Sequence, residues 1–341
     1  MSGGMRAVVQ DRYGPVDEVL HLREVPVPEV ADDEVLVRVR AASVHPDIWH
    51  VVTGRPYVLR LMGSGVRRPQ SRIPGTDLAG QVESVGRRVT RFRVGDEVFG
   101  ESLPGFQWRN GGTFAEFVAV QEEILAAKPP GVTFEEAATL PTAGIIAVHN
   151  LRYGERLVAG QEVLVNGAGG GVGSIAVQLA KAAGARVTGV DAPHKLELLR
   201  SLGADQVVDY TCEDFTRSGR RYDLIFDVAS NLTLPARRRA LAPGGIYVLI
   251  GHDHFGAARG RVLGTLPQAL GQMALSPLVA HLPRPDLSPP RKREAMAILR
   301  NALEAGQLTP AIDRAYPLEE AGAALRRLAS GDAVGRIVVI P

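Results

Sequence analysis

One stretch of the chain, from Val163 to Lys195, constrains the fold more than any other. It reads VLVNGAGGGVGSIAVQLAKAAGARVTGVDAPHK, so a short apolar run, a cluster of glycines, a helical stretch and a second apolar run follow in close order. Glycines let a backbone approach a pyrophosphate closely, and a helix N-terminus offers unpaired N–H groups and partial positive charge. The order therefore predicts a strand, helix and strand unit that binds a dinucleotide.

The predicted unit assigns roles to particular residues. Val163–Asn166 is the expected first strand, and Asp191 ends the second, about 20 residues beyond the glycines, where an acid can accept hydrogen bonds from a ribose. The loop departs from the GxGxxG pattern, because Ala168 stands in place of its first glycine. Gly251 ends the later apolar run GGIYVLIG and is expected beside the same cleft. The predicted cofactor-binding residues of this unit are Gly167, Ala168, Gly170, Gly171, Val172, Gly173, Asp191 and Gly251.

The rest of the chain divides into stretches that differ in their hydrophobic pattern. Residues 5–120 contain short alternating runs such as EVLVRVRAASV and TFAEFVAV, which predict β-strands joined by turns. From about Lys128 onward, strand-sized apolar runs alternate with helical stretches, which indicates an α/β fold with a parallel sheet between helices. The single late strand GRIVVIP is expected to rejoin the first domain. We predict domain limits at 1–127, 128–283 and 284–341, with the two outer segments forming one domain.

Composition narrows the range of partners. The 341 residues include 39 basic and 37 acidic side chains, a formal net charge of +2, which gives no reason to expect nucleic acid or a membrane surface as a partner. The start MSGGMRAVVQ lacks the pattern of a secretory signal, and no apolar run reaches the length of a bilayer span. Cys212 is the one cysteine, so it can form neither an internal disulfide nor a multi-cysteine zinc site. We expect a cytoplasmic enzyme that acts on a small molecule.

Several short motifs occur in a family-like order along the chain. They include RAASVHPDIW, IPGTDLAGQVESVG, VGDEVFG and the loop NGAGGGVG. These motifs resemble RAASVNPxDW, PGxDxAGxVxxVG, GDxVxG and GAxGGVG of the zinc-independent quinone oxidoreductase (zeta-crystallin-like) branch of the medium-chain dehydrogenase/reductase superfamily. The resemblance extends over nearly the whole chain. It implies a GroES-like, β-rich catalytic domain made from both chain ends, a Rossmann domain between them, a cofactor cleft where the two meet, and a homodimer.

The same resemblance bears on metal binding. Zinc-dependent relatives place a ligand Cys where this chain has His45 and a ligand His where it has Thr76. Catalytic zinc usually needs three protein ligands, so we expect no zinc. The run His252–Asp253–His254 is the alternative cluster, and a polar loop explains it more simply. Without a Lewis acid, reduction of a quinone or an electron-poor C=C bond is favoured over oxidation of an unactivated alcohol.

A metal-free reductase needs a donor for the acceptor's oxygen. Tyr57 is the first candidate, because relatives often carry a tyrosine soon after this turn glycine, although the spacing here is one residue longer. His45, which replaces the branch's usual Asn, is the second, since imidazole can donate to a carbonyl. Each has a structural interpretation as well: Tyr57 can anchor its loop, and His45 can be a packed loop histidine. Both remain open as catalytic candidates.

The sequence gives conflicting indications about NADH and NADPH. Asp191 would accept from both ribose hydroxyls of NADH and repel the 2′-phosphate of NADPH. Lys195 and Tyr210, by contrast, match positions where NADPH-using relatives contact that phosphate, whereas Ala192 replaces the phosphate-binding Ser or Thr of the family. We expect a slight preference for NADH, with NADPH as the alternative.

The leading hypothesis is an NAD(P)H-dependent reductase of quinones or α,β-unsaturated carbonyl compounds. The first alternative is an enoyl-thioester reductase or a pathway-specific alkene or carbonyl reductase, because the arginine-rich run RPYVLRLMGSGVRRPQSR could contact an anionic carrier. A solvated basic loop is the simpler account of that run. The second alternative is a dinucleotide-binding protein without catalysis, which is suggested by Ile146 where relatives often have Thr near the nicotinamide.

Overall fold

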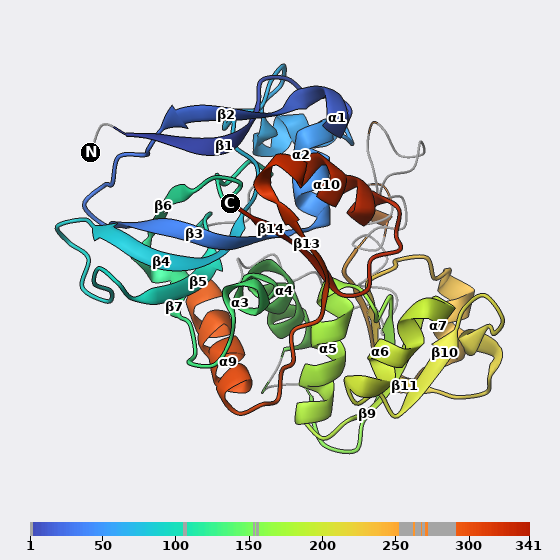
Figure 1. The fold of residues 1–341 in the computed structure, drawn as a ribbon. Helices are drawn as coiled ribbons and strands as arrows, with labels where there is room; N and C mark the ends of the chain where they lie inside the picture. The colour runs from blue at the N-terminus through green and yellow to red at the C-terminus, as the bar shows by residue number, and fades with distance from the viewer. Residues whose placement is uncertain are drawn as a thin grey trace.

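Two β-sheets organise the chain. The computed structural model describes residues 3–104, 108–152, 154, 157–251, 262, 267, 270–271 and 291–341. A mostly antiparallel sheet occupies one side of this structure and a five-stranded parallel sheet the other (Figure 1). They correspond to the β-rich and α/β stretches that the sequence predicts.

The β-rich unit is built on a seven-stranded sheet of order β13-β14-β3-β4-β5-β7, in which β6 pairs with β3. In β6 every second residue is buried, as the alternating run TFAEFVAV predicts. A second small sheet, β1 with β2, adds a layer through a cluster that includes Ala7 and Val9. The strands are β1 (Gly4–Gln10), β2 (Leu20–Pro26), β3 (Glu34–Val44), β4 (Asp77–Val85), β5 (Glu97–Glu101), β6 (Phe117–Gln121), β7 (Leu125–Ala127), β13 (Ile312–Pro317) and β14 (Arg336–Ile340).

Short helices close the ends of this unit. α2 (Pro46–Thr53) begins with proline at its first position and ends at Gly54, whose left-handed φ of 62° stops it. α1 (Val16–Val19), α2 and α10 (Ala321–Ala329) pack against one another over the sheet's apolar core. Irregular turns lie at Arg60–Ser64, Glu122–Ile124 and Leu318–Glu320.

The α/β unit is a parallel sheet of order β10-β9-β8-β11-β12. Its central strand β8 is an apolar run followed directly by the glycine cluster, and α5 crosses from it to β9. The strands are β8 (Glu162–Asn166), β9 (Arg186–Asp191), β10 (Gln206–Asp209), β11 (Tyr222–Asp227) and β12 (Leu241–Leu249). The helices and short turns are α5 (Gly171–Ala182), Pro193–Lys195, α6 (Leu196–Ser201), Phe215–Arg217 and α7 (Leu234–Ala240). The order confirms the predicted Rossmann-type sheet.

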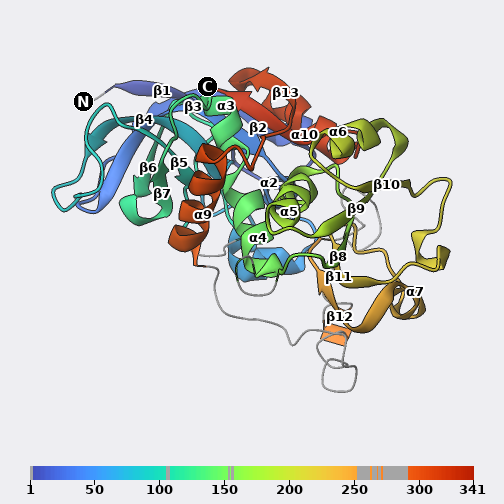
Figure 2. The same ribbon diagram turned by 90° about the horizontal axis from the view of Figure 1, so that it is seen from below.

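Three helices join the two units. α3 (Phe134–Ala138) starts with a capping box between Thr133 and Glu136 and packs on β3 and β4. α4 (Pro141–Leu151) contacts α5 on one side and β5 on the other, and α9 (Lys292–Glu304) packs on α4 and β7. Both views place α4 between the β-rich unit and the parallel sheet (Figure 2). In the described part of the chain, no helix combines the length and apolar character that a bilayer crossing requires.

The end of the chain returns to its beginning. β14 pairs antiparallel with β3, with Ile337 opposite Val44 and Val339 opposite Ala42. The termini therefore lie in the same β-rich unit, as Figure 1 shows. This pairing confirms the prediction that GRIVVIP rejoins the first domain, whereas the domain limits at 127/128 and 283/284 stay predictions.

Candidate functional site

The glycine turn connects β8 to α5 with little room for side chains. Gly167 has a φ of +79°, which favours glycine. A Cβ on Gly173 would lie 2.2 Å from the Gly167 carbonyl oxygen, so helix and turn approach closely only because residue 173 is glycine. A Cβ on Gly170 would meet nothing nearer than 3.8 Å. The predicted strand, turn and helix are therefore present, and Gly170, at the N-cap of α5, is where a ligand could approach the backbone.

Asp191 lies at the end of β9 and faces this turn. Its Oδ2 accepts a 2.7 Å hydrogen bond from the Gly169 amide, and its Oδ1 accepts one of 2.8 Å from the Ala192 amide. Lys195 Nζ lies 3.7 Å from Asp191 Oδ1 and donates to the Gly331 carbonyl at 2.9 Å. The structure thus brings the predicted acid and lysine together beside the glycines.

The two remaining predicted cofactor residues lie at strand ends of the same sheet. Tyr210 follows β10, and its amide donates to the Asp191 carbonyl at 3.4 Å, while its side chain is exposed. Gly251 follows β12 closely, and a Cβ there would lie 2.2 Å from the Val228 carbonyl oxygen. All of these positions therefore gather at the carboxyl edge of the parallel sheet, which is where α/β proteins bind ligands.

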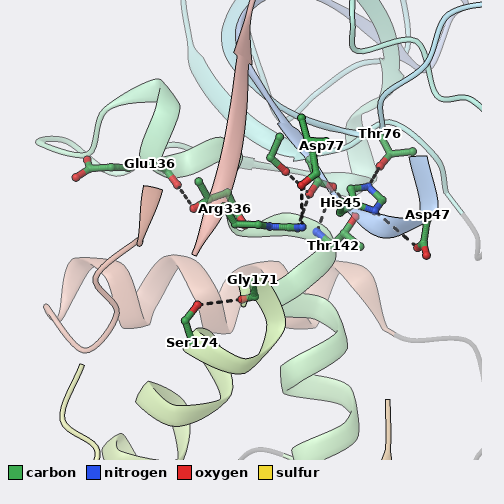
Figure 3. Close-up of polar contacts among 12 residues, drawn as sticks. His45, Asp47, Thr76, Asp77, Glu136, Thr142, Gly171, Ser174 and Arg336 are labelled. Atoms are coloured by element: carbon green, nitrogen blue, oxygen red, sulfur yellow. Dashed lines mark hydrogen bonds and ion pairs between the residues drawn. The ribbon is translucent and has the colours of Figure 1, made fainter. Parts of the chain in front are cut away.

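Arg336, which the sequence interpretation missed, links the glycine turn to the β-rich unit. Its aliphatic part packs so closely on Gly171 that a Cβ there would be 2.5 Å from Arg336 Cδ. Its guanidinium lies 3.1 Å from the Asp77 carboxylate (Figure 3). It also donates to the Thr139 carbonyl. The neighbouring Gly335 amide donates to the Gly169 carbonyl at 2.8 Å. The last strand thus contacts the glycine turn directly.

A cavity opens beside this junction, between α2, α4 and the segment 108–110. Its apolar wall consists of Ile48, Val51, Leu103, Trp108, Ile145 and Ile146. Its polar residues are His45, Asp47, Thr76, Glu101, Arg109, Asn110, Thr142 and Lys292. An apolar pocket with a few polar groups is typical of small-molecule sites.

His45 lies in this cavity, but it is almost fully buried. Its Nε2 is 2.6 Å from Thr76 Oγ1, and its Nδ1 is 3.8 Å from Asp47 Oδ2 (Figure 3). Burial, followed by the nearby Arg336 charge, lowers the pKa of His45 well below its ordinary value. The imidazole is therefore neutral near pH 7, and its role as a donor stays a prediction.

Tyr57 has a different environment. Its side chain is 44% exposed, and it is not among the residues that line the cavity. The guanidinium of Arg60 lies 4.7 Å from its ring centroid and 4.4 Å from that of Tyr13. This stacking accounts for Tyr57 structurally, and its catalytic role stays a prediction.

Asp47 is the polar cavity residue whose chemistry the sequence interpretation missed. Burial in the cleft, followed by the nearby Glu101 carboxylate, raises the pKa of Asp47 to about 7. Two of the three carboxyl groups in this cluster form an ion pair: Glu101 with Lys292, and Asp77 with Arg336. Asp47 is the third. The Asp47 side chain is still 33% exposed, so this carboxyl group is accessible and is a further candidate for a proton donor near neutral pH.

The donor set at this position does not fit a catalytic zinc ion. The two residues that replace zinc ligands of the relatives, His45 and Thr76, are hydrogen-bonded to each other. Within the described ranges, no three His, Cys, Asp or Glu side chains gather in a way that could hold a metal. The alternative cluster His252–Asp253–His254 lies outside the described residues.

Comparison with known proteins identifies the family. The alcohol dehydrogenase GroES-like domain matches residues 31–130, and the zinc-binding dehydrogenase family matches residues 202–339. A chloroplastic quinone-oxidoreductase homolog of Spinacia oleracea is 30% identical, covering 99% of this chain and 98% of its own length. A quinone oxidoreductase of Pseudomonas aeruginosa is 32% identical, covering 95% of this chain and 96% of its own length.

A solved structure agrees. The quinone oxidoreductase from Coxiella burnetii superposes with a TM-score of 0.80 at 25% identity, covering 99% of this chain and all of the other. The chain therefore belongs to the medium-chain dehydrogenase/reductase superfamily. Quinone oxidoreductases are among its relatives, as its motifs predicted.

A pair of glycine variants separates folding from cofactor binding. Gly173→Ala should lower the free energy of unfolding by about 1–3 kcal/mol, because its Cβ collides with the Gly167 carbonyl. Gly170→Ala should leave stability within about 0.5 kcal/mol but weaken NADH and NADPH binding about tenfold, because its methyl group occupies the approach to the helix N-terminus. Thermal unfolding and fluorescence titration measure both. If Gly170→Ala binds both coenzymes as tightly as the wild type, the coenzyme does not bind at this turn.

Proposed function

We propose that this protein is an NAD(P)H-dependent reductase that transfers hydride to a quinone or an α,β-unsaturated carbonyl compound without zinc. The observation that carries the proposal is the cavity described above, which combines an apolar wall with the Asp47 carboxyl group, whose pKa is raised to about 7, and in which His45 and Thr76 are hydrogen-bonded to each other. Relatives named quinone oxidoreductase and NADPH-dependent alkenal/one oxidoreductase support the substrate class.

Each part of the site has a role in this proposal. The backbone from Gly167 to Gly173 and the side chains of Asp191, Lys195 and Tyr210 would hold the coenzyme. The bound nicotinamide supplies the hydride. The apolar wall positions the acceptor and excludes water, and the Asp47 carboxyl proton is transferred to the acceptor as its negative charge develops.

Steady-state assays test the proposal directly. Purified protein should oxidise NADH or NADPH in the presence of a benzoquinone or a short alkenal or alkenone, and a chelator should leave the rate unchanged. Inactivity with both acceptor classes and both coenzymes would overturn the proposed function. Loss of activity with the chelator and its return with zinc would overturn the zinc-free part alone.

The pH dependence should identify the proton donor. A carboxyl group with a pKa near 7 is protonated below pH 7, so kcat/KM should be level there and fall tenfold per unit above it. Asp47→Asn should remove this limb and lower kcat/KM about 100-fold. Tyr57→Phe and His45→Asn are the comparison variants. If Asp47→Asn keeps the rate and the profile, one of the other two candidates must supply the proton.

The preference between coenzymes depends on Asp191. Its carboxylate accepts hydrogen bonds from the Gly169 and Ala192 amides, and Lys195 lies beside it. At the adenosine ribose of the coenzyme, the Asp191 charge would favour NADH and the Lys195 charge would favour NADPH. Asp191→Ser should raise kcat/KM for NADPH relative to NADH, because it removes the charge that repels a 2′-phosphate. If the ratio of kcat/KM for NADPH to that for NADH is unchanged in Asp191→Ser, Asp191 does not set the coenzyme preference.

Other parts of the expectation stay predictions. The homodimer rests on the family resemblance, and the cytoplasmic location rests on the sequence pattern, while relatives include proteins named chloroplastic and mitochondrial. The slight preference for NADH likewise awaits measurement.

A further inference from the structure

The segment Trp108–Asn110 carries a cation into the cavity wall. Arg109 lines the cavity, and its Nε is buried without a hydrogen-bond partner. Among the residues that the structure describes, none forms an ion pair with its guanidinium. Arg109 as a whole is only half-buried, but an N–H donor that is buried without a partner is costly, so its position beside an apolar wall requires an explanation.

The residues that follow Arg109 are held by hydrogen bonds. Asn110 Nδ2 donates to Gln10 Oε1 at 3.1 Å and to the Ser71 carbonyl at 2.8 Å. The next amide, of Gly111, donates to the Gly75 carbonyl at 2.9 Å. The arginine therefore extends from an anchored segment, and binding a ligand would not require this segment to become ordered first.

The acidic groups of the cavity do not neutralise Arg109. Glu101 is paired with Lys292, and no ion pair in the described chain joins Arg109 to Glu101 or Asp47. The charges that act on the pKa of Asp47 are those of Glu101, Arg336 and Asp77, and Arg109 is not among them. The cavity thus has a proton-holding end at Asp47 and a separate cationic position at Arg109.

We propose that Arg109 binds a carboxylate of the acceptor, so that the natural substrate is an unsaturated carbonyl compound with a carboxylate-ended tail. This inference rests on the proposed function. One guanidinium matches one carboxylate through two parallel hydrogen bonds. A doubly charged phosphate fits less well, because one guanidinium neutralises only one of its two charges.

Matched acceptors test the proposal. Linear enones whose alkyl tails end in a carboxylate, in several tail lengths, are compared with their methyl esters. At the best length the wild-type protein should have about 10- to 100-fold higher kcat/KM for the acid, and added salt should reduce this preference. Arg109→Gln should abolish the preference and leave the ester within about threefold. Arg109→Lys should restore part of it, because it returns the charge without the planar fork.

The control is Arg67→Gln, which removes the same charge from an exposed residue of a nearby turn and should keep the acid preference. The proposal is overturned if the wild type never prefers the acid, if Arg109→Gln retains the preference, or if Arg67→Gln loses it equally. Binding of hexanoate, measured by NMR titration, separates the two proposals. If no acceptor is reduced, hexanoate binding that is lost in Arg109→Gln still supports the carboxylate site, and hexanoate binding unaffected by the variant overturns it.

Discussion

The ion pair between Arg336 and Asp77 is the interaction on which the site depends. Arg336 belongs to the last strand and Asp77 to β4, and both side chains are nearly inaccessible to water. Removing one partner from such a pair costs about 3–5 kcal/mol, because the other charge stays buried without compensation. Asp77 also accepts hydrogen bonds from Ser43 and Thr142, so the pair fixes β3, β4, α4 and β14 around one point. The glycine turn rests on the same arginine.

The balance of charge around this pair decides what chemistry the cavity can perform. Burial raises the pKa of Asp77, Glu101 and Asp47 alike, and the pKa values of Asp77 and Glu101 stay raised although Arg336 and Lys292 act against the effect. Asp47 Oδ2 lies 3.8 Å from His45 Nδ1, and the Arg336 charge lowers the pKa of Asp47 less than burial and the Glu101 carboxylate raise it. In the described chain, Asp47 is therefore the member of this carboxyl cluster that has no ion pair with an arginine or lysine.

How much the sequence predicts depends on the separation between interacting residues. The glycine turn, Asp191 and the parallel sheet were predictable, because their determinants lie within one short strand, helix and strand unit. The late strand was assigned correctly because a single strand has no place in a completed sheet. The pairs Arg336–Asp77 and Lys292–Glu101 join residues far apart in sequence, and no local pattern indicates them. Tyr57 was chosen because relatives carry a tyrosine near this position. Its ring stacks on the Arg60 guanidinium, a contact that the spacing of residues in the sequence does not indicate.

The return of β14 to β3 also governs the order in which the protein can assemble. The first strands leave the ribosome long before the strand that completes their sheet, whereas the parallel sheet closes within one continuous segment. Contacts between distant parts of a chain form slowly, so the α/β unit is the natural first structure and the N-terminal strands must wait with an open edge. Only after Arg336 has been translated can β14 complete its pairing with β3 and the buried ion pair with Asp77 form.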